Sequence, residues 1–193
     1  KWWRMAADQG EAQAQCSLGI MYHQGQGVAQ DYSAAIKWYR MAADQGDAEA
    51  QCGLAFMYDS GQGVAPDYSA AMEWYRMAAN QGLVHAQFSL ARMYYEGQVV
   101  AQDYLAAMKW FRMAADQGDA KAQYNLGVMY DNGDGVAQDY SAAMKWFRMA
   151  ADQGDAQAQC SLGFMYDNGH GVAQDHSAAI KWYRTAADQG HAN

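Results

Sequence analysis

The sequence repeats itself every 36 residues, and this period constrains the fold more than any other feature. A tryptophan recurs at this interval along the chain, at Trp2, Trp38, Trp74, Trp110, Trp146 and Trp182. Near-identical tandem units argue against a single globular core, because each unit must bury its apolar side against its neighbours. The chain is therefore predicted to be a linear array of small structural units.

The period divides the chain into complete repeats flanked by two partial ones. Residues 11–190 form five complete repeats, which span 11–46, 47–82, 83–118, 119–154 and 155–190. Residues 1–10 match the second half of a repeat, and residues 191–193 match the start of another. We therefore expect a fragment of a longer protein, in which end-to-end self-association through the cut ends would be an artefact of truncation.

Each repeat contains two helical segments separated by a glycine-rich loop. Over residues 12–24 the larger apolar residues recur with the 3.6-residue period of a helix that has one buried face. Gly25 favours the positive φ that ends a helix, and Asp31 is suited to cap the N-terminus of the next one. Gly19 belongs to a column that contains only Gly or Ala, which indicates close contact between helices.

Three motifs of the repeat resemble those of the Sel-1-like repeat family, a relative of the tetratricopeptide repeats. They are Ala-Gln-x-x-Leu-Gly-x-x-Tyr from Ala14, Gly-x-Gly-Val-x-x-Asp-Tyr from Gly25, and Ala-x-x-Trp-Tyr-Arg-x-Ala-Ala-x-x-Gly from Ala35. The resemblance covers essentially the whole chain. It implies an all-α fold, an α/α solenoid of stacked antiparallel helix pairs in a right-handed superhelix, with the first helices on the concave side.

The same resemblance implies a function. Members of this family act as non-catalytic scaffolds or adaptors for other proteins, and they are often bacterial and exported or periplasmic, although a cytoplasmic location stays open. One departure from the family pattern is the third loop, Gly97-Gln98-Val99-Val100, which lacks the second glycine and is expected to be reshaped or strained.

Composition and motifs exclude several other functions. The net charge is −8, so the chain is a poor ligand for phosphate backbones and no nucleic-acid partner is expected. No apolar run is long enough for insertion into a membrane. The loops 131–135 and 167–171 place a glycine where a calcium loop needs an oxygen ligand, and no dinucleotide motif follows a strand, so we expect neither a metal nor a cofactor.

Two columns of reactive or charged residues have structural interpretations. Cys16, Cys52 and Cys160 share one column, which predicts reduced, buried thiols. Arg40 precedes Asp44 by four residues, as in most other repeats, which predicts ion pairs along an exposed helix face. A cysteine-rich branch of the family, linked to β-lactam binding or hydrolysis, offers an alternative function, but its paired cysteines are absent from these repeats.

The candidate binding residues lie on the first helix of each repeat, on the side that its apolar stripe leaves exposed. Their identity changes between repeats while the scaffold columns barely change, and small residues stand next to apolar or charged ones, as in a peptide-binding groove. Neutral drift on a purely structural spacer is the alternative. The predicted partner-binding residues are Gln13, Ser17, Ile20, Gln24, Glu49, Gly53, Phe56, Ser60, His85, Ser89, Arg92, Glu96, Lys121, Asn125, Val128, Asn132, Gln157, Ser161, Phe164 and Asn168.

Overall fold

The computed structural model describes residues 2–189, and within this range the only regular secondary structure is α-helix. The chain divides into two compact units, Lys1–Ala101 and Gln102–Asn193. The boundary lies in the loop of the third repeat, so that repeat contributes its first helix to unit 1 and its second helix to unit 2. The partial repeat expected at 191–193 lies outside the described residues.

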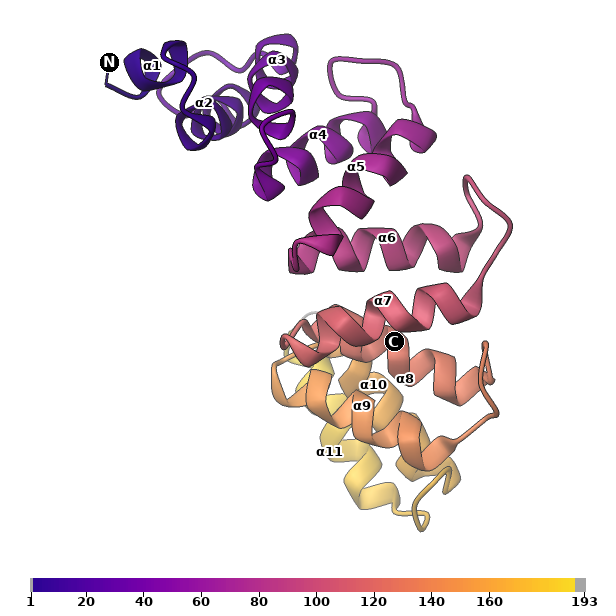
Figure 1. The fold of residues 1–193 in the computed structure, drawn as a ribbon. Helices are drawn as coiled ribbons and strands as arrows, with labels where there is room; N and C mark the ends of the chain where they lie inside the picture. Colours follow the sequence, from indigo (N-terminus) through magenta and orange to yellow (C-terminus); the bar gives the residue numbers. More distant parts are fainter. Residues whose placement is uncertain (1, 190–193) are drawn as a thin grey trace. The chain divides into compact units, whose positions relative to one another are not determined.

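The helices follow the predicted two-per-repeat pattern in both units (Figure 1). Unit 1 contains α1 (Trp2–Asp8), α2 (Ala12–Gln24), α3 (Tyr32–Ala43), α4 (Ala48–Ser60), α5 (Tyr68–Asn80) and α6 (Val84–Glu96). Unit 2 contains α7 (Tyr104–Asp116), α8 (Ala120–Asn132), α9 (Tyr140–Asp152), α10 (Ala156–Asn168) and α11 (His176–Ala187). The helix predicted over 12–24 is confirmed as α2.

Packing within each unit joins neighbours in the chain. Consecutive helices form the extensive contacts, from α1 with α2 to α5 with α6 in unit 1, and from α7 with α8 to α10 with α11 in unit 2. Contact one repeat apart is seen between α2 and α4. Stacked helix pairs without a central core are the architecture that the period predicted.

Both ends of the helices are set by the repeated polar and glycine residues. The Asp31 carboxylate accepts a hydrogen bond from the backbone N–H of Ala34 at 2.9 Å, and the equivalent aspartates cap α5, α7, α9 and α11 in the same way. At the other end, Gly25 takes a left-handed conformation with φ of 70°, and its N–H returns to the carbonyl of Met21. These caps satisfy backbone groups that helix ends leave unpaired.

An aromatic ring of the second helix lies directly against the first helix in the first, fourth and fifth repeats. A Cβ atom on Gly19 would approach Cδ1 of Tyr39 to 2.5 Å, and one on Gly127 would approach Phe147 equally closely. The Gly-or-Ala column is thus explained by close packing, as predicted. The ring is buried at Tyr39 and Phe147 and exposed at Tyr183 of the last helix, whereas the neighbouring tryptophan, such as Trp38, is only partly buried.

The third loop is reshaped and unstrained. In the second, fourth and fifth loops the second glycine lies against the start of the preceding repeat's second helix: a Cβ atom on Gly63 would lie 2.5 Å from that of Tyr32. Val99 occupies the equivalent position in the third loop, and no non-glycine residue in the described part of the chain has positive φ. Val99 and Gln98 instead line a hollow of 590 Å³ beside Tyr68.

A ladder of buried glutamines joins each repeat to the next. Gln51 at the start of α4 is 1% exposed, and its Nε2 donates to the carbonyl of Ala43 near the end of α3 at 3.3 Å. Its Oε1 accepts from Nε2 of Gln81, just after α5 of the same repeat, at 2.9 Å. The same two bonds recur at Gln15, Gln123 and Gln159. The sequence analysis found this column but assigned it no role.

The ladder predicts a large stability difference between two glutamines on first helices. Gln51→Met removes both hydrogen bonds of the buried amide, the one to the carbonyl of Ala43 and the one from Gln81, which should lower the free energy of unfolding by about 1–3 kcal/mol. Gln13→Met, at an exposed position of α2, should change it by less than about 0.5 kcal/mol. Urea denaturation followed by far-UV circular dichroism measures both. Equal changes in the free energy of unfolding for the two variants would show that the hydrogen bonds of the ladder do not stabilise the fold.

Candidate functional site

The predicted binding residues lie on α2, α4 and α6 of unit 1 and on α8 and α10 of unit 2, and none of them is buried. We call this surface the first-helix face. Its positions are of three kinds, which differ in what their side chains contact: a column of small residues, positions with polar side chains, and a column of larger side chains.

The column of small residues, to which Gly53, Ser89 and Ser161 belong, is explained by packing. A Cβ atom on Gly53 would lie 2.9 Å from the ring of Tyr39, which belongs to the preceding repeat. Ser89 lies near the hydroxyl of Tyr75, and Ser161 lies near the hydroxyl of Tyr124. These residues are small because an aromatic side chain occupies the adjacent space, rather than to admit an approaching chain.

Several short polar side chains of the face are bound to their own helix. Each donates to the backbone carbonyl four residues earlier, at 2.7 to 2.9 Å: Ser17, Ser60, Asn125 and Asn168. Such local bonds satisfy the side chain without a partner molecule. The polar positions therefore leave the larger side chains as the distinctive part of the face.

The column of larger side chains supplies the exposed apolar groups. It contains Ile20, Phe56, Arg92, Val128 and Phe164, which we call the knob column. Phe56 is 40% exposed and Phe164 is 50% exposed, whereas Ile20 and Val128 are partly buried against the cores of their units. Exposed phenylalanines on a rigid helical surface are the kind of anchor that protein interfaces use.

Two knobs of unit 1, Phe56 and Arg92, each lie against a residue of the preceding repeat, from a column that was not predicted to matter. The ring of Phe56 lies 5.6 Å from that of His23, and Arg92 Nη2 lies 2.9 Å from Oδ2 of Asp59. In each pair the two residues are 33 positions apart in the sequence, which is three positions less than the length of a repeat. Column 23, 59, 95, 131 and 167 varies in type as the knob column does, and that variation was the available signal.

In unit 2 the face contains a large hollow of 1090 Å³. Three of the predicted residues line it, Gln157, Ser161 and Phe164. The rest of its wall is mainly aromatic and apolar, with Asp131 and Arg184 as the charged groups. Part of this wall, Ile180, Tyr183 and Ala187, comes from α11 and is the surface that in the first repeat packs in one core with the following α4. The structure thus brings one repeat's predicted residues together around a cavity of the size that ligand sites commonly have.

An unpaired carboxylate and imidazole lie beside this hollow. Asp131 Oδ1 and His170 Nδ1 are both covered from solvent, and neither has a hydrogen-bond partner. The His170 ring stacks on Tyr140 with 4.5 Å between centroids and meets the edge of Phe164 at 5.6 Å. Burial raises the pKa of Asp131, and the nearby His170 partly opposes this shift. Unpaired buried polar atoms are uncommon in folded proteins, so this pair calls for a functional explanation.

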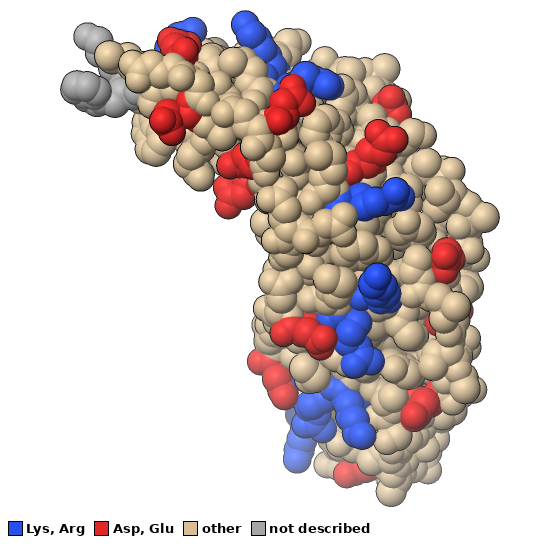
Figure 2. Space-filling view, in the orientation of Figure 1, with Lys and Arg blue, Asp and Glu red and all other residues tan. Residues whose placement is uncertain are grey.

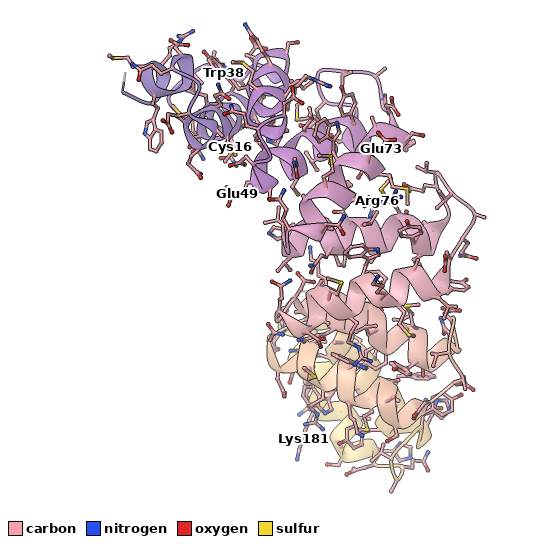
Figure 3. All side chains as sticks on the ribbon, viewed as in Figure 1. Cys16, Trp38, Glu49, Glu73, Arg76 and Lys181 are labelled. Carbon is pink, nitrogen blue, oxygen red and sulfur yellow. The ribbon has the colours of Figure 1, made fainter. Side chains whose placement is uncertain are left out.

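The arginines of the second helices do not form the predicted ion pairs. Arg76 of α5, labelled in Figure 3, donates to the hydroxyl of Tyr94 of α6 at 3.2 Å. Arg40, Arg112 and Arg148 reach the equivalent tyrosine of the next repeat. The Arg112 guanidinium also lies 4.7 Å from the ring centroid of Trp146. These long side chains bridge repeats, because a ring one repeat away offers both a polar and a π partner.

The three cysteines are free, as predicted, but only Cys16 is fully buried, while Cys52 and Cys160 are partly buried. Burial, reinforced by Asp47, raises the pKa of Cys16 to about 12, and burial raises that of Cys52 to about 11. A thiolate is the reactive form, so these two thiols are poor nucleophiles at neutral pH. Cys16 lies within α2, where Figure 3 labels it.

The remaining surface shows no specialised chemical centre in the part of the chain that the structure describes. Acidic and basic side chains are interspersed over the face seen in Figure 2. Across residues 2–189 no three His, Cys, Asp or Glu side chains are placed to hold a metal ion. No helix in this range is both long and apolar enough to cross a membrane.

Comparison with known proteins identifies related chains. The profile of the Sel1 repeat matches residues 1–11, 12–47, 48–83, 84–119, 120–155 and 156–191, each one residue later than the repeats defined above. No curated protein matches the chain.

Among solved structures, a protective antigen of uropathogenic Escherichia coli strains, which displays this repeat fold, is 39% identical with a TM-score of 0.95. The match covers 98% of this chain but only 41% of the antigen, so the chain spans less than half of that relative. A Sel1 repeat protein from Oxalobacter formigenes is 35% identical over 95% of this chain and 75% of its own, with a TM-score of 0.90.

A more distant likeness concerns the fold alone. An immunity protein of Pseudomonas aeruginosa is 21% identical, with a TM-score of 0.59 over 96% of this chain and 71% of its own. These relatives are named as repeat, antigen or immunity proteins. Repeats of this kind commonly serve as scaffolds for protein interactions.

The geometry at Asp131 predicts a variant that stabilises the protein. Because the folded-state pKa of Asp131 lies above its ordinary value of 3.8, the folded state binds this proton more tightly, and stability falls as pH rises through the interval between the two values. Asp131→Asn removes that penalty, so it should raise the melting temperature at pH 7 and have much less effect at pH 3.

Asp59→Asn is the matched control, since it removes one partner of the ion pair with Arg92. It should leave stability unchanged or lower it by up to about 1 kcal/mol. Thermal unfolding of both variants at the two pH values tests this difference. A lower melting temperature for Asp131→Asn at pH 7 would mean that its carboxylate stabilises the fold.

Proposed function

The chain belongs to the Sel1 repeat family, and we propose that it is a non-catalytic scaffold that binds a protein or peptide along its first-helix face. The observation that carries this proposal is the hollow of unit 2, where the predicted residues Gln157, Ser161 and Phe164 surround 1090 Å³. Phe164 stands half exposed at this hollow without serving the core.

The separation between the columns that pack the repeats together and the exposed knob column supports this function. Invariant columns meet the packing needs of each repeat, through the glutamine ladder and the ring that lies on the Gly-or-Ala column. The knob column takes no such part where Phe56 and Phe164 stand exposed, so its side chains can change without loss of the fold. A rigid preformed surface of this kind binds with little cost in conformational entropy.

The proposal includes a location. The similar structures come from bacteria, and one of them is called a protective antigen. These names support a bacterial protein that is exported or periplasmic, in which the scaffold meets its partner outside the cytoplasm.

Selection of peptides from a random displayed library against the chain tests the proposed binding face. We expect selected peptides to lose about tenfold in affinity for Phe164→Ala, since removal of a central aromatic anchor commonly costs more than about 1 kcal/mol. Met149→Ala is the matched control, because Met149 is 46% exposed on a second helix. Fluorescence anisotropy with a labelled peptide measures both affinities.

Two results would contradict the proposal. Peptides that bind Phe164→Ala as tightly as the wild type, but bind Met149→Ala weakly, would move the site to the second helices. A library that yields no binder of the folded chain would favour a structural spacer.

A further inference from the structure

Three repeats place a carboxylate at the same position of the first helix: Asp59 on α4, Asp131 on α8 and Asp167 on α10. Asp167 contacts His176 at 2.7 Å, so the comparison of interest is between Asp59 and Asp131. In unit 1 this carboxylate is neutralised by the chain itself. The guanidinium of Arg92, from the next first helix, lies 2.9 Å from Asp59, whose side chain is only 14% exposed. Arg92 is held in turn by Glu96 at 3.3 Å. The position therefore accepts a guanidinium group, and unit 1 shows it occupied.

Unit 2 has the same carboxylate without the arginine. Phe164 takes the place in α10 that Arg92 takes in α6, so no cation from the next first helix reaches Asp131. The result is the unpaired Oδ1 of Asp131 and the unpaired Nδ1 of His170, both covered from solvent. At the equivalent positions of unit 1, His23 and Gln62 pair with each other at 3.1 Å. Asp131 and His170 lack that mutual bond.

The surroundings of Asp131 suit a flat, delocalised cation. Asp131 lines the hollow together with Tyr124 and Phe164, and Phe164 is 50% exposed. Aromatic faces attract a guanidinium through its charge and its plane, and the outer oxygen of a carboxylate accepts an N–H bond from it, as Oδ2 of Asp59 does from Arg92. Arg184 lines the same hollow and is the other charged group there, so a second cation would have to enter on the side of Asp131.

We propose that Asp131 is a receptor for an arginine side chain of the bound partner, which enters the hollow beside Phe164 and pairs with the carboxylate as Arg92 pairs with Asp59. This inference rests on the proposed function and names the chemistry of the partner: a segment that carries an arginine next to an apolar residue. The aromatic wall of Phe164 and Tyr124 then holds the apolar neighbour and the guanidinium plane.

The test uses two small probes that differ only in charge, N-acetyl-arginine amide and its neutral isostere N-acetyl-citrulline amide. Each is titrated into the folded chain while the carboxyl ¹³C signals of Asp131 and Asp59 are followed by NMR. We expect the arginine probe to shift the Asp131 signal in a saturable manner, with an affinity at least tenfold higher than that of citrulline. The Asp59 signal should not move, because Arg92 already occupies that carboxylate.

Two reciprocal substitutions test the geometry further. Phe164→Arg supplies a guanidinium from within the chain, and it should abolish the response of Asp131. Arg92→Phe vacates Asp59, so the arginine probe should gain a second, new response at Asp59. A gain of binding cannot result from misfolding, and the unchanged far-UV circular dichroism of each variant confirms that the helices are intact.

Asp131→Asn, which is close in shape, should abolish binding at this position, seen as loss of the arginine-specific shifts at the His170 ring. The proposal is overturned if citrulline shifts Asp131 as strongly as arginine, if the response survives in Phe164→Arg, or if Arg92→Phe gains none. Peptides that depend on Phe164 but show no preference for arginine would overturn it while the proposed function stands. Arginine-specific binding at Asp131, together with a library that yields no peptide, would contradict the proposed function while the arginine receptor stands.

Discussion

Each repeat buries a glutamine side chain at its junction with the preceding repeat, and the hydrogen bonds of the glutamine ladder are how this chain satisfies that amide. A single side chain donates to the preceding repeat and accepts from the second-helix end of its own repeat, as Gln51 does between Ala43 and Gln81. A polar bond in a buried place is directional and costly to leave unmade. The ladder therefore defines the register of successive repeats in each unit, while apolar contacts supply most of the favourable burial.

Because a few columns of residues hold the repeats together, one surface of the first helices can vary in sequence. Packing needs are met by residues that hardly change, the buried glutamine, the ring such as Tyr39, and the small residue beneath it. The knob column then varies from Ile20 to Phe164 with little consequence for the fold. Local pairs such as Arg92 with Asp59 show that this variation is organised, since a charge on one repeat finds its complement on the next.

Sequence reasoning predicted what depends on spacing within one repeat. The bounds of α2, the cap at Asp31 and the close contact at Gly19 all follow from local periodicity and from the stereochemistry of single residues. It failed where a side chain reaches into another repeat. Arg40 was assigned to Asp44 on its own helix, but its guanidinium extends far enough to meet Tyr58, and that reach depends on how helices stack. Asp131 was missed for the same reason.

Contacts at offsets of 33 and 39 residues have an evolutionary consequence, because they always join two successive repeats. A duplication or deletion of one repeat by unequal crossing-over would conserve every residue that holds the stack together. It would nevertheless create new neighbours at the junction, so that a carboxylate such as Asp59 could face a phenylalanine instead of Arg92. Recombination alone, without a point mutation, could thus open or close a charged position on this surface.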